Sequence, residues 1–197
     1  MSMAAMLRQH FPVEPVARDG STEPHSRYGI RYLAGASGLW IEANWPWMRA
    51  RFLAHPFRTH GPAVYGDPDP MLELPKLRFA VFQEFLELAR QAAPNEVGAW
   101  VMYRPDTGEQ RLVVPEQVAT PDSVDYRRPQ PEPGEFAVWD IHSHGDDRAF
   151  FSAIDNGDDF ADVKIALVVG HVGEARPSMV SRLVVRDCFC PLQEGLS

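Results

Sequence analysis

The stretch from Phe136 to Gly170 reads FAVWDIHSHGDDRAFFSAIDNGDDFADVKIALVVG and changes its hydrophobic pattern twice. Its beginning, 136–142, is rich in aromatic and β-branched residues, which predicts a β-strand. The segment 152–163 predicts a helix, and the apolar run IALVVG at 165–170 predicts a buried strand. A strand, a helix and a second strand in this order predict an α/β or α+β protein in which helices flank a sheet.

The chain on either side of this stretch predicts one long helix and three more strands. Five apolar residues between Pro75 and Pro94 recur at spacings of four, four, three and four, as on one face of a helix: Leu77, Val81, Phe85, Leu88 and Ala92. Proline suits the first turn of a helix and also stops one, so we expect this helix to run from about Pro75 to Pro94. Strands are predicted at 97–103, 111–114 and 181–186.

The N-terminal part predicts a β-rich extension. Segments 28–33 and 39–43, joined by a turn-prone GASG, predict a hairpin, and the alternation at 48–52 predicts a further strand. Three nearby tryptophans fit a core, or the edge of a site that grips a peptide. Prolines cluster at 54–75 and 115–133, where we expect a connector and a long surface loop. The predicted division is therefore an extension with its connector, 1–73, and a second domain, 74–197.

The composition excludes several classes of protein. With 197 residues, 45% of them hydrophobic and 23% charged, the chain has the composition of an ordinary globular protein. Its net charge of −8 repels phosphate backbones and anionic lipid, so neither nucleic acid nor a membrane is an expected partner. Cys188 and Cys190 are too few for a disulfide framework. Residues 1–9 carry no apolar run of signal-peptide length, and we expect a cytoplasmic location.

The segment around the two histidines predicts a metal site. His142 and His144 are two residues apart in a predicted strand, so their side chains point to the same face. Asp155, one turn into the predicted helix, can bring a carboxylate to the same ion. Two nitrogens and one oxygen leave a tetrahedral position for water, as hydrolytic zinc requires. Such a site also needs a general base, and Glu96, at the end of the predicted long helix, is the candidate.

These residues carry a family resemblance. The pattern H-S-H at 142–144, followed after seven residues by S-x-x-D at 152–155 and preceded by a glutamate, resembles the JAMM motif of the JAB/MPN metalloproteases. The resemblance covers about 74–187 and implies a cytidine-deaminase-like fold with a central mixed sheet. It implies one Zn²⁺ per chain bound by both histidines and the aspartate, Glu96 as general acid and base, and Ser152 as a donor to the oxyanion.

Within this family the chain is similar to a subfamily encoded in the PRTRC cassette, a bacterial gene set with ParB-related and ThiF-related members. The strings GIRYL at 29–33, GLWIE at 38–42 and AFFS at 149–152 carry this likeness. The resemblance implies a small ubiquitin-like protein, or its conjugates, as substrate. A ThiF-like activating enzyme from the same cassette is a further implied partner.

Other roles are open for the same residues. S-x-x-D at a helix start is also the pattern of a capping box. Ordinary core or surface positions are an alternative for both histidines, and an ordinary exposed position is an alternative for Glu96. The metallo-β-lactamase pattern also begins H-x-H-x-D, but it needs a histidine where this chain has Asp147. Asp140 either orients a ligand or is solvated, and the acidic run at 155–162 is expected to be a polar helix face.

The sequence predicts a zinc-dependent metallopeptidase. Its expected reaction is hydrolysis of an amide or isopeptide bond that follows the C-terminal tail of a ubiquitin-like protein. A module that keeps the fold and binds such a partner without turnover is the alternative. A third hypothesis is hydrolysis of a small amide or thiocarboxylate carrier in sulfur metabolism.

Overall fold

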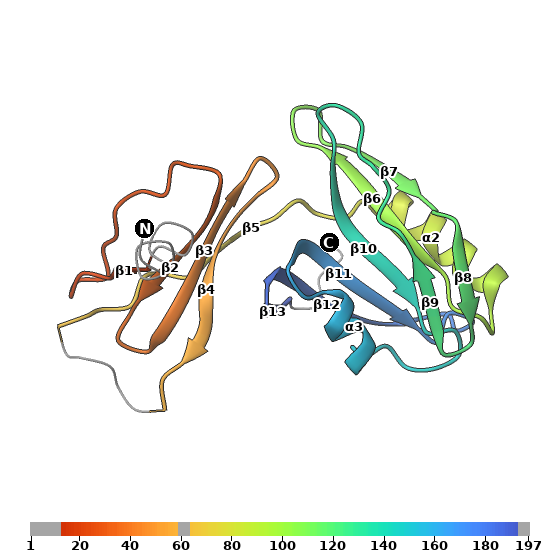
Figure 1. Cartoon of the computed structure of the whole chain (residues 1–197). Helices are drawn as coiled ribbons and strands as arrows, with labels where there is room; N and C mark the ends of the chain where they lie inside the picture. Colours follow the sequence, from red (N-terminus) through yellow and green to blue (C-terminus); the bar gives the residue numbers. More distant parts are fainter. Residues whose placement is uncertain (1–12, 59–63, 193–197) are drawn as a thin grey trace, which may run out of the picture. The chain divides into compact units, whose positions relative to one another are not determined.

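The computed structural model describes residues 13–58 and 64–192 and is drawn in Figure 1. The chain forms two compact units, Met1–Pro75 and Lys76–Ser197, each with its own sheet. The predicted lack of a signal segment at 1–9 lies outside the described residues. Within the described part, the structure contains no helix that is both long and apolar enough to span a membrane.

The first unit is a five-stranded sheet in the order β1-β2-β3-β4-β5. Its strands are β1 (Val13–Pro15), β2 (Gly29–Ala34), β3 (Gly38–Trp45), β4 (Met48–Pro56) and β5 (Met71–Glu73). The hairpin β2–β3 and the strand after it are confirmed, and Trp40 and Trp47 are buried in the core. The predicted connector at 54–75 was partly wrong, because β4 runs to Pro56 and β5 pairs with its beginning.

The second unit contains a six-stranded mixed sheet in the order β13-β12-β11-β10-β6-β7 and a separate two-stranded sheet, β8-β9. Its strands are β6 (Gly98–Arg104), β7 (Glu109–Val113), β8 (Gln117–Thr120), β9 (Ser123–Tyr126), β10 (Phe136–Ser143), β11 (Asp162–Gly170), β12 (Ser178–Arg186) and β13 (Cys188–Leu192). Strands β10 and β11 are parallel, and the other pairs are antiparallel. The expected mixture of helix and sheet is therefore present.

Helix α2 (Phe79–Ala92) buries Val81 and Phe85 of the predicted face, whereas Leu88 and Ala92 are only half-buried. Its other buried residues lie on the adjacent stripe and are Phe82, Leu86 and Ala89. It ends before Pro94 as expected, but it begins later than predicted. The side chain of Gln110 accepts a bond from the Arg78 amide and donates one to the Lys76 carbonyl. Because these bonds keep 76–78 extended, Pro75 does not lie in the first turn.

The segment 115–133, predicted as a surface loop, contains the hairpin β8–β9. Pro121 does not prevent it, because this proline lies in the turn between the two strands, where a fixed φ is favourable. The hairpin is bonded to the start of β6: the Glu96 amide donates to the Thr120 carbonyl, and the Gln117 side chain bonds both backbone groups of Gly98.

Two predictions near the C-terminus also need correction. The helix predicted at 152–163 is only the six-residue α3 (Ala153–Asp158), because the chain enters β11 at Asp162 and pairs there with β12. Strand β13, which contains Pro191, was not predicted. As β13 is the last strand of its sheet, the missing proline amide leaves no ladder bond broken inside the sheet.

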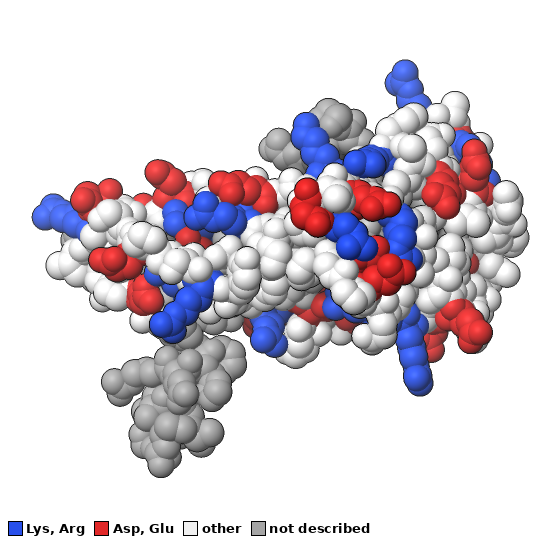
Figure 2. All heavy atoms as spheres, turned by 90° about the horizontal axis from the view of Figure 1, so that it is seen from above, with Lys and Arg blue, Asp and Glu red and all other residues white. Residues whose placement is uncertain are grey.

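Charged side chains are mixed on the face of the molecule that Figure 2 shows. Acidic and basic groups alternate there, and no broad region of one sign stands out.

Because Gly98 has no side chain, the ring of Tyr126 in the hairpin β8–β9 can pack against it. We therefore predict that Gly98→Ala destabilises the fold. A Cβ at this position would overlap the ring of Tyr126, whose hydroxyl is held by Asp140. Overpacking of this kind costs about 1–3 kcal/mol in the free energy of unfolding. Urea unfolding measures this cost, with Gly173→Ala as the control because its added Cβ meets nothing within 4 Å. Equal losses in the two variants would contradict the prediction.

Glu135 makes the stability of the second unit dependent on pH. Bonds from the Arg111 guanidinium outweigh the effect of burial and lower the pKa of Glu135 from 4.5 to about 2. Because the folded pKa is depressed, its contribution is complete above about pH 4.5 and is lost as the pH falls toward 2. We expect Glu135→Gln to lower the unfolding free energy at pH 7 and to match the unmodified protein near pH 2. A constant difference across this range would refute the prediction.

Candidate metal centre

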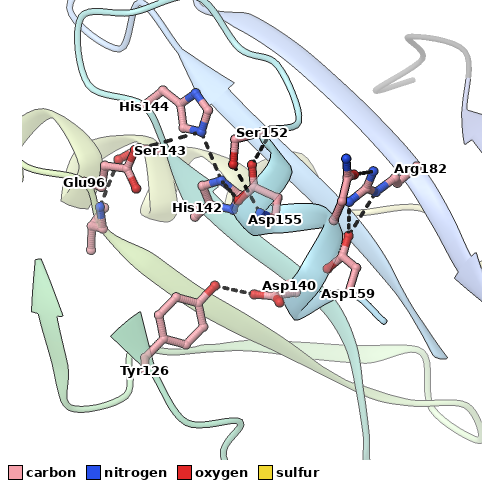
Figure 3. Close-up of polar contacts among 12 residues, drawn as sticks. Glu96, Tyr126, Asp140, His142, Ser143, His144, Ser152, Asp155, Asp159 and Arg182 are labelled. Carbon is pink, nitrogen blue, oxygen red and sulfur yellow. Dashed lines mark hydrogen bonds and ion pairs between the residues drawn. The ribbon is translucent and has the colours of Figure 1, made fainter. Parts of the chain in front are cut away.

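The two histidines lie together at the end of β10. This strand is central in its sheet, between β6 and β11, and Ile141 on β10 and Val168 on β11 are both buried. His144 follows the strand and still donates its amide to the Val169 carbonyl, so the alternation of faces continues through it. The Nε2 atoms of His142 and His144 are 3.2 Å apart, and the structure thus brings both rings to one point (Figure 3).

Asp155 reaches the same point from α3. Its Oδ1 is 3.2 Å from His142 Nε2, and the ligand atoms of both histidines and the aspartate all lie within 4.8 Å of one another. The capping box is present as well: the Ser152 amide donates to Asp155 Oδ2, and the Asp155 amide donates to Ser152 Oγ. The two interpretations of S-x-x-D are compatible, because the cap uses one carboxylate oxygen and leaves the other for the histidines.

Glu96 lies on the opposite side of the histidines from α3. It comes directly after α2 and before β6, is 7% exposed, and places Oε1 3.9 Å from His144 Nε2. Gly145 permits this approach, because it has a φ of +52° and a Cβ there would meet the Pro94 carbonyl at 2.8 Å. The alternative that Glu96 is exposed is therefore wrong, and its role as general base stays a prediction.

The electrostatics of the cluster follow from burial and proximity. Burial raises the pKa of Glu96 to about 7; the charge of His142 opposes this shift and that of Asp155 adds to it. Burial and the charge of His142 lower the pKa of His144. For His142, burial is outweighed by the bond to Asp155, which raises the pKa, and the same bond keeps the pKa of Asp155 below its usual range despite burial.

The cluster opens into a cavity of about 380 Å³ between α3 and the hairpin β8–β9. Nine of the residues that line it are Asp or Glu, and two are Arg or Lys. This surplus favours cations in the cavity. Two imidazole nitrogens and a carboxylate oxygen that converge here are a donor set that suits Zn²⁺, so the residues present fit the implied metal.

Of the polar residues that surround the cluster, the sequence indicated Asp140 but not its partners Tyr126 and Lys164. Tyr126 donates to Asp140, which also accepts from Lys164, so Asp140 is not free in solvent. Asp159 is 4% exposed and bonded to Arg182, so it is wrong to describe the whole acidic run as a polar helix face. Lys164 and Arg182 each lie in an otherwise apolar segment of the sequence. These two charged residues were the signal that could have indicated buried acidic partners.

Comparisons with known proteins place these observations in a family. The model for prokaryotic homologs of the JAB domain matches residues 79–185, which is more than half of the chain. The mixed α/β unit with its histidine motif is therefore a JAB-type domain, and the chain belongs to this prokaryotic JAB family. Residues 1–75 match a domain of unknown function, DUF2016. The cytidine-deaminase-like detail of the fold and the PRTRC likeness stay predictions.

A solved structure, the solution structure of protein DSY2949 from Desulfitobacterium hafniense, is similar over 59% of this chain and 88% of that chain, with 22% sequence identity and a TM-score of 0.44. The comparison with curated proteins finds no match.

Zinc affinity tests the ligand set directly. We predict that Asp155→Asn weakens binding by more than the roughly 10–100-fold that loss of an outer partner costs, and that His144→Ala abolishes stoichiometric zinc. Competition against a chromophoric chelator measures the affinity. Asp158→Asn is the matched control, since it removes the same charge from the same helix and lies outside the cluster. Equal effects of the two aspartate variants would exclude Asp155 as a ligand.

Proposed function

We propose that this protein is a zinc-dependent metallopeptidase that hydrolyses an amide or isopeptide bond, with the C-terminal tail of a ubiquitin-like protein on the acyl side. The observation that carries the proposal is the convergence of His142, His144 and Asp155 within 4.8 Å, with the Glu96 carboxylate beside them. A protein that only binds a partner has no use for this arrangement. Membership of the prokaryotic JAB family supports the same reaction class.

Different residues of the chain would have different roles in the reaction. His142, His144 and Asp155 would hold the metal, which when bound lowers the pKa of a water and polarises the carbonyl of the substrate. Glu96 is placed to accept the proton of the attacking water at its carboxylate and then to deliver that proton to the leaving nitrogen. Its position 3.9 Å from His144 Nε2 keeps it beside the cluster without making it part of the converging set.

Ser152 fits the role of an oxyanion donor. Its Oγ already accepts the amide of Asp155, which orients the side chain while its hydroxyl hydrogen stays available for a second partner. An oxygen that becomes negatively charged beside the cluster would be a suitable acceptor. The capping box thus supports the catalytic geometry.

The cavity supports a peptide substrate. Trp100 lines it, and among the residues that the structure describes its indole N–H is the buried side-chain donor without a partner. The hairpin β8–β9 borders the same cavity, where an extended tail could follow a strand edge through main-chain bonds. The surplus of acidic side chains favours neutral or basic residues near the scissile bond. A ThiF-like enzyme that activates the ubiquitin-like protein would complete the proposed setting.

Replacement of the general base tests the mechanism. We expect Glu96→Gln to lower the rate of cleavage of a ubiquitin-like fusion by about 10²–10⁴-fold, because glutamine cannot carry the proton. Zinc content should stay stoichiometric, since Glu96 is not a ligand. Glu87→Gln is the control, as Glu87 is exposed on α2. Equal rates for Glu96→Gln and the unmodified enzyme would remove Glu96 from the mechanism, and a metal-free, folded protein would refute the enzyme.

A further inference from the structure

We infer that Asp159, held by Lys164 and Arg182, is a positioning residue that fixes α3 on the sheet and thereby sets the place of the Asp155 carboxylate. The link to the metal rests on the proposed function. The effect of Asp159 on the order of α3 does not depend on the proposed function.

Helix α3 has little apolar packing to hold it. It is six residues long, all of them described, and none of them is buried. Ile154 is 64% exposed, and Phe160, just beyond the helix, is 66% exposed. Gly157 lowers the helix propensity further. Since a helix of this length is unstable by itself in water, polar contacts to the rest of the unit must order it.

The capping box does not supply this attachment. Both of its bonds join Ser152 and Asp155, so they shape the first turn without connecting it to a strand. The contact of Asp155 with His142 does reach β10. It belongs to the metal cluster itself, however, so it does not account for how Asp155 is positioned there.

Asp159 provides the attachment at the other end of the helix. Its amide donates to the Asp155 carbonyl at 2.9 Å, which couples the two residues through one helical turn. Its side chain accepts from Arg182 Nε at 2.9 Å through Oδ2 and from Lys164 Nζ at 2.6 Å through Oδ1. All three residues are 6% exposed or less, so the charges are removed from water and their pairing is expensive to break.

Arg182 holds the segment at three places. Besides Asp159, its guanidinium donates to the side-chain oxygen of Asn156, in the middle of α3. Its charged group also lies 3.8 Å from the ring centre of Phe151, just before the helix, and 4.1 Å from that of Phe189 in β13. Figure 3 shows the guanidinium reaching from its strand toward Asp159. One planar side chain thus contacts the segment before, within and after the helix.

Lys164 connects this attachment to the histidine strand. Its ammonium lies 2.6 Å from Asp140 Oδ2 as well as from Asp159 Oδ1. Asp140 is two residues before His142 on β10. Asp159, at the end of α3, and Asp140, on the strand that carries His142, are therefore tied to the same ammonium group. This limits how far α3 can move relative to the histidines.

The experiment replaces Arg182 by lysine, which keeps the charge but cannot contact Asn156 and Asp159 together. In the metal-free protein, we expect amide exchange at Asn156 and Asp159, whose donors bond within α3, to become at least about tenfold faster. Zinc affinity should fall by about 10–100-fold. Arg128→Lys is the matched control: Arg128 pairs with Asp162 and makes no bond to α3, so both readouts should match the unmodified protein.

A second substitution separates order from charge. Gly157→Ala favours the helix, and no atom lies within 4 Å of the added Cβ. Combined with Arg182→Lys, it should recover about fivefold in both readouts, because alanine stabilises a helix relative to glycine. If Arg182 acted on the metal only through its charge, Gly157→Ala would restore neither the exchange rates nor the zinc affinity.

Each outcome decides the inference. Exchange in α3 that is unchanged in Arg182→Lys would overturn it, and so would zinc affinity within twofold of the unmodified protein. If Arg182→Lys does not fold, Asn156→Ser removes one contact at an exposed position and should still accelerate exchange. An unmodified protein that binds no zinc would refute the proposed function, while the exchange rates would still show whether Asp159 orders α3.

Discussion

The candidate site depends on one carboxylate whose two oxygens make different contacts. Asp155 Oδ2 accepts the amide at the start of α3, and Oδ1 faces the Nε2 atom of His142. The residue therefore caps the first turn of the helix and also completes the cluster. The topology makes this possible. Strands β10 and β11 are parallel, so the chain must cross between them, and α3 lies in that crossover, next to the carboxyl end of β10. Ligands in open α/β sheets gather at such ends.

The same strand end holds the candidate base. Ser143, between the two histidines, is fully buried, and its hydroxyl accepts the Val97 amide while its own amide donates to the Val97 carbonyl. The amide of Glu96 is bonded to Thr120 in the hairpin. Glu96 is thus fixed between β10 and the hairpin, and this explains how a carboxylate stays beside His144 at a depth where burial opposes its charge. The serine of the H-S-H motif connects the base to the ligands through the backbone.

Buried charges connect the parts of the second unit around the site. Asp140, Asp159, Lys164 and Arg182 come from three strands and from the end of α3, and together they contact the hairpin through Tyr126. Each charge would be costly to bury alone, and pairing offsets that cost. Such a network specifies one arrangement of the elements, because a shift that separates these groups leaves buried charges without partners.

The sequence by itself determined the elements that depend on neighbouring residues. The alternation in 136–144 places His142 and His144 on one face, and the capping box places Asp155 one turn into a helix, because strand faces and helix starts depend on residues a few positions apart. The tertiary structure alone decided the rest. The hairpin β8–β9, the late start of α2 and the burial of Asp159 depend on partners such as Gly98, Gln110 and Arg182. Those partners are distant in the chain, and strand pairing brings them close, so no local pattern records them.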